Sequence, residues 1–377
     1  MDPIPEKPEP LAILESWLAG QMKARTGDFD MNDEPDAEVI EPFAMLATAI
    51  AYLQRHVTEP WRTADQLAIE SQARHHVFSS VAIAAGVWAV VSAVLQLALK
   101  VGEAADWQVN LASGMEVIAA IAACIAVIVG LWAKFDHHWL EQRHKAERLR
   151  MLKFQSLRRT ELWNGDCKMW EDWVRQQVEM LLKIDTLEQI EAWVSYDDLH
   201  SDSGPPLANQ GPADSIHALG IYYRHKRLLY QADYFDRKGR AARDHWAVRR
   251  HRLQLYLFMG SVVCVIAHFG CDLLIAHTRS QAAGLILERL GLILLVTAAL
   301  LPVLSIGLRT YLSVFELARK ARSFKGKHKE MIDACDRILA HPESLDGMLK
   351  EMKHDEQELE HEHRDWLRLL MHVEWFL

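Results

Sequence analysis

The sequence predicts an all-α membrane protein with four transmembrane helices in two parallel-repeat hairpins, extended by cytoplasmic helices. Three observations predict this fold class: four long apolar runs, an uneven distribution of Lys and Arg around them, and helical spacing of apolar residues elsewhere. The mean hydropathy of the 377-residue chain, -0.07, hides this pattern because the apolar residues are concentrated in blocks. No alternating strand pattern is longer than about four residues, so we expect no sheet.

The four apolar runs are each long enough to cross a bilayer. The longest, Val77–Leu99, has 23 residues and no charge. At about 1.5 Å rise per residue, such a helix exceeds the roughly 30 Å of a hydrocarbon core. Burial inside a large soluble protein is the alternative, but about 18 or more apolar residues in a row are typical of a membrane span. We therefore predict membrane helices at about 77–99, 112–133, 253–275 and 288–308.

Positive charge is distributed unevenly around these runs. The two hairpin loops, 101–112 and 278–289, carry no Lys or Arg and two Arg, respectively. The other flanks hold eight, ten and seven Lys and Arg, at 134–159, 217–252 and 309–329. Because positive flanks stay on the cytoplasmic side, both hairpin loops should lie outside. We expect a multi-pass membrane protein with both termini and the middle segment in the cytoplasm.

The two halves share a plan, and we predict that they are repeats. Each has a polar helical approach, a hairpin and a basic helix that leaves the membrane, and the exits begin at Gly130-Leu131 and Gly307-Leu308. Because an even number of spans separates the hairpins, the repeats are parallel. The expected domains are an acidic segment at 1–37, a first repeat at 38–195, a Pro-, Gly- and Ser-rich linker at 196–215 and a second repeat at 216–377.

The remaining sequence adds one clear helix and several exclusions. Apolar residues recur at three-to-four spacing over 170–182, which predicts an amphipathic helix, and Gly165-Asp166 is a plausible start for it. The five cysteines form no Cys-x-x-Cys pair, so neither a disulfide framework nor a zinc site is expected. No phosphate-binding glycine loop, dinucleotide fingerprint, nucleophile elbow or His-Glu-x-x-His motif is present. We predict that the chain is not an enzyme and uses no cofactor.

Short motifs on the charged helices resemble those of the SLATT family, the SMODS- and SLOG-associating two-helix membrane effector domain. The second approach carries Arg227-Leu228, Gln231, Tyr234-Phe235 and Lys238. The helix after the first hairpin carries Ala146-Glu147-Arg148-Leu149-Arg150, and the C-terminal part carries Glu362–Trp366 and Glu374-Trp375-Phe376. The resemblance spans roughly 60–160 and 220–377. The chain departs from the commoner form in having two hairpins and an acidic start of about 40 residues.

The resemblance implies membrane hairpins extended by cytoplasmic helices and a role as a pore-forming effector in bacterial conflict systems. Such effectors are often encoded with nucleotide-messenger synthases or sensors, and they disrupt the membrane after phage infection. The resemblance therefore implies an antiphage, abortive-infection function. The candidates for binding a signal are Arg227, Gln231, Lys238, Arg148 and Arg150. The basic runs at 143–159 and 217–252 could bind a nucleotide or RNA through their phosphates. The favoured interpretation is that they serve topology and contact with anionic lipids, since no glycine loop accompanies either run.

Ionisable residues and a proline in or near the spans are candidates for lining or gating a pore. His268 and Asp272 are four residues apart, so they share one helix face near the outer end of the third span. Glu116 lies near the outer start of the second span. The alternative is that these groups are interfacial and hydrated. Pro302 should kink the fourth span, as a gate hinge or as a feature of helix contact.

Two histidine sets have the spacing of metal ligands on a helix. They are His137, Glu141 and His144, with His138 adjacent, and His354, Glu358 and His361. A solvated helix face is the simpler interpretation, because closed zinc sites need four well-placed ligands. We expect no metal.

Three functions fit this pattern, in decreasing order. The first is a signal-gated membrane effector that acts as a homo-oligomer, because four helices per chain are few for a pore. The second is a non-conducting membrane-anchored scaffold or sensor. The third is a transporter, which is weaker because no span is broken near its middle by paired Gly and Pro. The expected partners are the lipid bilayer, further copies of the chain, and a cyclic or other nucleotide messenger or a co-encoded sensor protein, with no specific nucleic acid.

Overall fold

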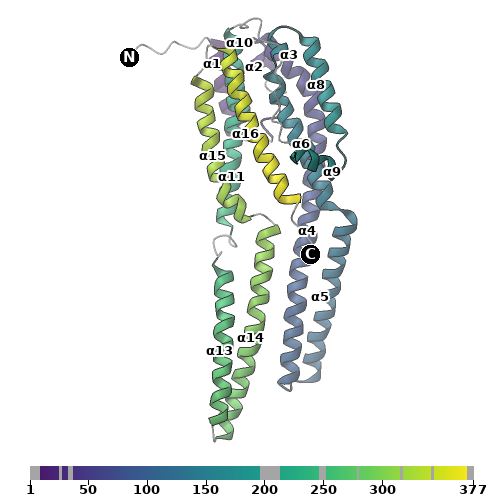
Figure 1. Ribbon diagram of the computed structural model, residues 1–377, viewed down its shortest axis with the longest axis vertical. Helices are drawn as coiled ribbons and strands as arrows, with labels where there is room; N and C mark the ends of the chain where they lie inside the picture. The colour runs from purple at the N-terminus through teal and green to yellow at the C-terminus, as the bar shows by residue number, and fades with distance from the viewer. Residues whose placement is uncertain are drawn as a thin grey trace, which may run out of the picture. The chain divides into compact units, whose positions relative to one another are not determined.

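The protein is an all-α membrane protein. The computed structural model describes residues 9–24, 28–32, 37–195, 213–245, 252–277, 280–314, 317–340 and 344–371, and within these ranges every regular element is a helix (Figure 1). The chain forms two units. The first, here the helical unit, is built from described residues of Met1–Gln72, Asp136–Lys238 and Ser323–Glu374. The second, here the span unit, is built from Ala73–Phe135 and described residues of Gly239–Arg322.

The span unit contains four helices that are long and apolar enough to cross a membrane. At most 17% of the most apolar stretch of any of them is buried inside the protein, so their apolar side chains are open to a surrounding lipid phase. All four predicted runs are confirmed as helices, and each helix extends beyond the predicted run. The four are α4 (Glu59–Val101), α5 (Asp106–Ala133), α13 (Leu253–His277) and α14 (Gln281–Val314).

Small residues form the contact faces of these helices. The buried residues of α5 are Ala112, Ala119, Ala126 and Gly130, which lie at intervals of seven, seven and four and so share one face. In the second hairpin, the Ser261 hydroxyl donates to the Ala298 carbonyl oxygen at 2.7 Å. Small residues let helices approach closely in lipid, where no hydrophobic force drives them together.

The helical unit surrounds one continuous apolar core to which both halves of the chain contribute. For example, the rings of Phe154 and Tyr223, one from each half, meet edge to face with their centroids 5.8 Å apart. The unit comprises α1 (Glu9–Ala24), α2 (Ala37–Ile40), α3 (Ala44–Leu53), the π-helical η2 (Gln54–Thr58), the start of α4, α6 (Phe135–Leu157), α7 (Thr160–Trp163), α8 (Cys167–Leu182), α9 (Leu187–Ser195), α10 (Ala213–Tyr223), the π-helical η3 (Arg224–Leu229), the first part of α11 (Tyr230–Asp244), the later part of α15 (Leu317–Ala340) and α16 (Leu345–Met371).

The predicted start of the amphipathic helix is confirmed. Gly165 has a φ of +83°, a conformation that glycine adopts without strain. The next residue, Asp166, caps α8 because its side chain accepts a hydrogen bond from the Met169 backbone N–H at 3.1 Å. One face of α8 then buries Trp170, Val174, Val178 and Leu181.

The two units do not follow the order of the chain. Each takes segments from both predicted repeats, so membrane-spanning character, and not repeat membership, separates them. The duplication and its boundaries stay a prediction. Residues 196–212 of the predicted linker lie outside the described residues, as do residues 1–8 and the C-terminal Glu374-Trp375-Phe376 motif.

Candidate functional site

A short acidic segment lies in the helical unit between two buried lysines. We call Asp28–Asn32 the acidic loop. Lys153 of α6 donates a hydrogen bond from Nζ to the Asp30 carbonyl oxygen. Lys226 of η3 donates from Nζ to the carbonyl oxygens of Phe29 at 2.9 Å and Asn32 at 2.7 Å. Both lysines are 0% exposed. Because buried ammonium groups need acceptors, these lysines fix the backbone of the loop.

The carboxylates of the acidic loop face Arg150 of α6. The Arg150 guanidinium lies 3.2 Å from Asp30 Oδ2 through Nε and 3.9 Å from Asp28 Oδ1 through Nη2. Tyr230 of α11 donates its hydroxyl to Asp28 Oδ1 at 3.2 Å. Burial raises the pKa of Asp30, against the opposing effect of Arg150. Within the described residues, neither carboxylate oxygen of Asp30 accepts a hydrogen bond of good geometry.

A second buried ion pair joins η3 to α16. Arg227 donates from Nε and Nη2 to the two carboxylate oxygens of Glu356, at 2.8 and 2.9 Å, which is the bidentate geometry that guanidinium and carboxylate groups favour. The side chains are 2% and 1% exposed. Tyr223 donates its hydroxyl to the same carboxylate at 3.1 Å. The pair connects segments 129 residues apart in the chain.

A third ion pair links α6 to α4. Arg143 donates from Nη1 to Asp65 Oδ1 at 3.0 Å, and its Nη2 lies 2.5 Å from Glu147 Oε1. Burial opposes the charge on Glu147, but Arg143 and Arg150 outweigh it and lower the pKa of this carboxyl to about 2. Glu147 therefore stays ionised and shared between two arginines.

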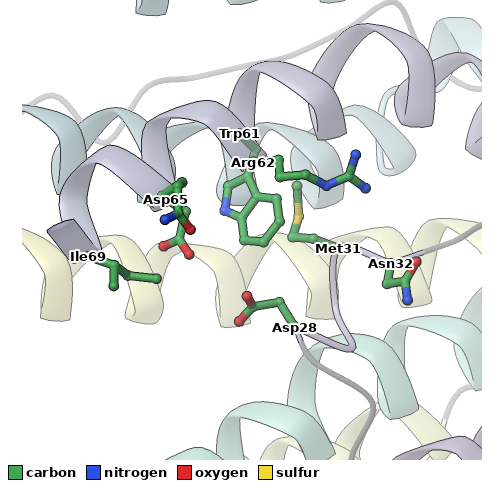
Figure 2. A pocket seen from close by; sticks show the side chains of 8 residues that line it. Asp28, Met31, Asn32, Trp61, Arg62, Asp65 and Ile69 are labelled. Carbon is green, nitrogen blue, oxygen red and sulfur yellow. The ribbon is translucent and has the colours of Figure 1, made fainter.

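A pocket of about 280 Å³ opens between the acidic loop and the first turns of α4 (Figure 2). The Trp61 indole stands in the centre of this view, with the Asp28 and Asp65 side chains close to it. Trp61 is 5% exposed, and its Nε1 has no hydrogen-bond acceptor among the described residues. The pocket is lined by Asp28, Met31, Asn32, Trp61, Arg62, Asp65, Gln66 and Ile69.

Two histidines meet elsewhere in the helical unit. His144 Nδ1 of α6 lies 3.1 Å from His363 Nε2 of α16, and the rings are stacked with their centroids 5.4 Å apart. The guanidinium carbons of Arg148 and Arg364 each lie 4.5 Å from the centre of the neighbouring Trp193 ring. Burial lowers the pKa of both histidines, that of His363 to about 3.

The predicted signal-binding residues are divided between these clusters. Arg150 and Arg227 lie near the buried Asp30 carboxylate, whereas Arg148 lies against the Trp193 ring. Gln231 is buried on α11, and Lys238 is exposed further along the same helix. Arg227 is engaged with Glu356 in a buried ion pair, and a role of Arg227 in binding a signal stays a prediction.

The span candidates are placed as follows. His268 Nε2 lies 3.6 Å from Asp272 Oδ2 on α13, which confirms that they share a helix face. The Nδ1 side of the His268 ring lies close to Gly291 of α14. A Cβ atom built onto this glycine would lie 3.2 Å from Nδ1, so the ring leaves little space for a larger residue there. Glu116 is half-buried on α5, and none of the contacts described joins it to His268 or Asp272. α14 continues as one helix through Pro302.

The two histidine sets with metal-ligand spacing do not assemble. His144 contacts His363 instead of its own set, and His138 Nδ1 lies 3.8 Å from Glu141. Among the described residues, no three His, Cys, Asp or Glu side chains are placed to hold a metal ion.

Sequence reasoning did not single out the residues at the centre of the site. Lys153 and Lys226 fall inside the basic runs considered for phosphate binding, whereas Asp30, Glu356 and Trp61 were not considered. Nothing local separates the two lysines from their neighbours, because residues 134–159 and 217–252 hold eight and ten Lys and Arg. The excess of acid near the N-terminus is a coarse signal: residues 1–60 hold twelve Asp and Glu against four Lys and Arg.

Comparison with protein-family models, with curated proteins and with solved structures gave no match.

Proposed function

We propose that this protein is a signal-gated membrane effector that forms or gates a pore in a bacterial inner membrane as part of an antiphage, abortive-infection response. The SLATT-like motifs on its charged helices support the defence role. In this proposal the helical unit holds the hairpins of a homo-oligomer closed until a nucleotide messenger or a co-encoded sensor protein binds. The energy for opening comes from the difference in affinity of the signal for the two states.

One observation carries the proposal: α4 is a single helix of 43 residues that belongs to both units. Its start carries five lining residues of the pocket, and its later part is the first apolar span. A shift or rotation imposed on a rigid helix at one end is transmitted to its other end. A signal that moves the acidic loop or Trp61 would therefore reposition the span. The lining residues on α4 are Trp61, Arg62, Asp65, Gln66 and Ile69.

A vesicle leak assay tests the proposal. The full chain is reconstituted in potassium-loaded vesicles beside Arg227→Met, which breaks the buried pair with Glu356 and loosens the helical unit. We expect a faster potassium leak from the variant, because an unpaired buried carboxylate destabilises the closed arrangement. Arg175→Met is the matched control, since Arg175 forms an exposed pair with Asp172. If neither protein leaks at equal incorporation, the effector proposal is wrong.

A non-conducting scaffold or sensor is the second candidate. The observation that favours it is the placement of His268, which packs against Gly291 of its own hairpin. The Nδ1 side of the His268 ring is then occupied by contact within the hairpin, and not by contact with a pore. In the assay above, vesicles that stay sealed with Arg227→Met would support this function.

A further inference from the structure

Three buried cations converge on the acidic loop from two segments of the chain. Arg150 and Lys153 project from α6, and Lys226 projects from η3. They are 6%, 0% and 0% exposed. Their partners on the loop are three backbone carbonyl oxygens and two carboxylates. We call these three side chains the basic cluster.

We infer that the basic cluster is a binding site for a phosphate-bearing ligand, and that the acidic loop occupies it as an internal substitute for that ligand. The oxygens of Phe29, Asp30 and Asn32 stand where phosphate oxygens would accept hydrogen bonds from the two lysines. The Asp30 carboxylate stands where a phosphate would face the guanidinium of Arg150. Phosphate is the ligand class because it brings more than one negative charge and several strong acceptors on one centre.

The loop meets the cluster through weaker acceptors than a phosphate would offer. Its contacts to the lysines are neutral carbonyl oxygens, and the Asp30 carboxylate lies beside Arg150 without a well-formed hydrogen bond. Arg150 Nη1 also lies 3.3 Å from Glu147 Oε1 of its own helix, so the loop shares this guanidinium. Burial also raises the pKa of Asp30, so the negative charge of the loop is held at a free-energy cost. A dianion that meets both lysines and the arginine fork would satisfy the same cations more completely.

Displacement of the acidic loop from the basic cluster would change the pocket beside α4. Asp28, Met31 and Asn32 of the loop form one side of that pocket, and residues 61–69 of α4 form the other. The consequence for the spans rests on the proposed function, whereas the binding site itself does not.

The test measures binding of inorganic pyrophosphate to the full chain in detergent. The variant Asp28→Asn/Asp30→Asn removes the charge of the loop and keeps its size. We expect this variant to bind pyrophosphate at least about tenfold more tightly than the wild type, since the internal competitor is weakened. Adding Lys226→Met to the variant should abolish the gain. Asp172→Asn/Asp346→Asn, which removes two exposed carboxylates, is the matched control and should bind as the wild type does.

A second measurement keeps the inference testable if the loop variant does not fold. Hydrogen exchange at the backbone amides of residues 29–32 is followed in the wild type during titration with pyrophosphate. We expect faster exchange as the loop leaves the cluster. Unchanged exchange, or equal pyrophosphate affinity of the wild type and a folded loop variant, would overturn the inference.

The same exchange measurement separates two sources of phosphate. In nanodiscs of phosphatidylglycerol without pyrophosphate, faster exchange at the loop than in phosphatidylcholine would assign the site to lipid headgroups. A response to soluble pyrophosphate alone would assign it to a free phosphorylated molecule. These measurements record binding of pyrophosphate and do not record leak. Binding without leak would therefore contradict the proposed function only, and leak without binding would contradict this inference only.

Discussion

At the scale of single residues, the helical unit holds several buried charged groups, of which Arg227 and Glu356 form a bidentate ion pair. The Arg227–Glu356 pair is nearly inaccessible to solvent, so its desolvation is expensive and its bidentate geometry has to compensate. Loss of one partner of such a pair typically destabilises a protein by about 3–5 kcal/mol, because the other charge stays buried and unpaired. These pairs therefore specify which helices meet, more than they add to net stability.

The His144–His363 pair makes the stability of the helical unit depend on pH. Burial lowers the folded-state pKa of both rings below the ordinary value of about 6.5, so the folded protein prefers the neutral forms. Arg148, Lys145 and the neighbouring ring oppose a charge on His144. Arg143, Arg148 and Arg150 oppose one on His363, whereas Glu147 favours it. The stabilising contribution is fully present above about pH 6.5 and is lost as the pH falls towards 3.

We predict that the thermal stability of the detergent-solubilised protein falls between about pH 7.5 and about pH 5.5. Each of the two histidines should contribute a loss of about 1.4 kcal/mol, because over this interval the unfolded chain takes up a proton and the folded chain does not. Asp355 opposes this loss, because burial raises its pKa to about 6 and the folded chain takes up a proton there. The measurement is the melting temperature by circular dichroism across this pH range. His363→Phe should make the dependence shallower by the contribution of one ring.

The control for this prediction lies on the same helix. His361 pairs with Asp365 on the surface of α16, with a side chain that is 58% exposed. His361→Phe should leave the pH dependence as it is in the wild type. Equal slopes for the wild type and His363→Phe would show that the buried pair does not control the response.

At the scale of elements, the proposed gating depends on α4. This helix continues without interruption through residues 72 and 73, where the helical unit ends and the span unit begins. The residues around this point belong to an uninterrupted helix, and Arg74 there is exposed, so it can be replaced without disturbing a core. A helix of this length holds its register because each turn is bonded to the next.

Breaking α4 at Arg74 should uncouple the pocket from the span. Arg74→Pro removes a backbone hydrogen bond and clashes with the preceding turn, at a cost of roughly 3 kcal/mol or more. We expect the variant to insert in the membrane and to lose the increase in vesicle leak that Arg227→Met produces when the two substitutions are combined. Arg74→Ala combined with Arg227→Met is the control and should leak as Arg227→Met does. A leaking Arg74→Pro combination would mean that α4 does not transmit the change.

The elements were predictable to different degrees. The spans follow from composition alone, because a run such as Val77–Leu99 has only one stable environment. The start of α8 follows from a local signal, the glycine and capping aspartate before it. The acidic loop did not follow from any local signal. Its partners are Lys153, 123 residues away, and Lys226, nearly 200 residues away, and no periodicity in the sequence encodes such a pairing.

At the scale of the whole molecule, the distribution of Lys and Arg predicts that both hairpin loops lie on one side of the membrane. We test this with single cysteines introduced into a chain whose five native cysteines are replaced by serine. Ala104→Cys lies in the first hairpin loop and Ser280→Cys in the second, whereas Lys183→Cys follows α8 in the helical unit.

A membrane-impermeant maleimide should label Ala104→Cys and Ser280→Cys in intact spheroplasts. It should label Lys183→Cys only after the membrane is permeabilised, because basic flanks stay inside. Labelling of one loop and not the other would mean that one of the four apolar runs does not cross the membrane. Labelling of Lys183→Cys and of neither loop in intact spheroplasts would reverse the predicted orientation. The order of the chain alone could not decide the orientation, since four spans place both loops on one side and do not say which side.

The long separation between the acidic loop and its lysines also governs biosynthesis. When residues 28–32 leave the ribosome, neither Lys153 nor Lys226 has been made, and Glu356 follows only after the last span. The carboxylates of the nascent N-terminus therefore stay in water until residue 226 has been made, after the first hairpin and before the second. The Arg227–Glu356 pair forms later still, because residue 356 is made only after the last span. A chain that ends before residue 356 would leave Arg227 without its counter-ion.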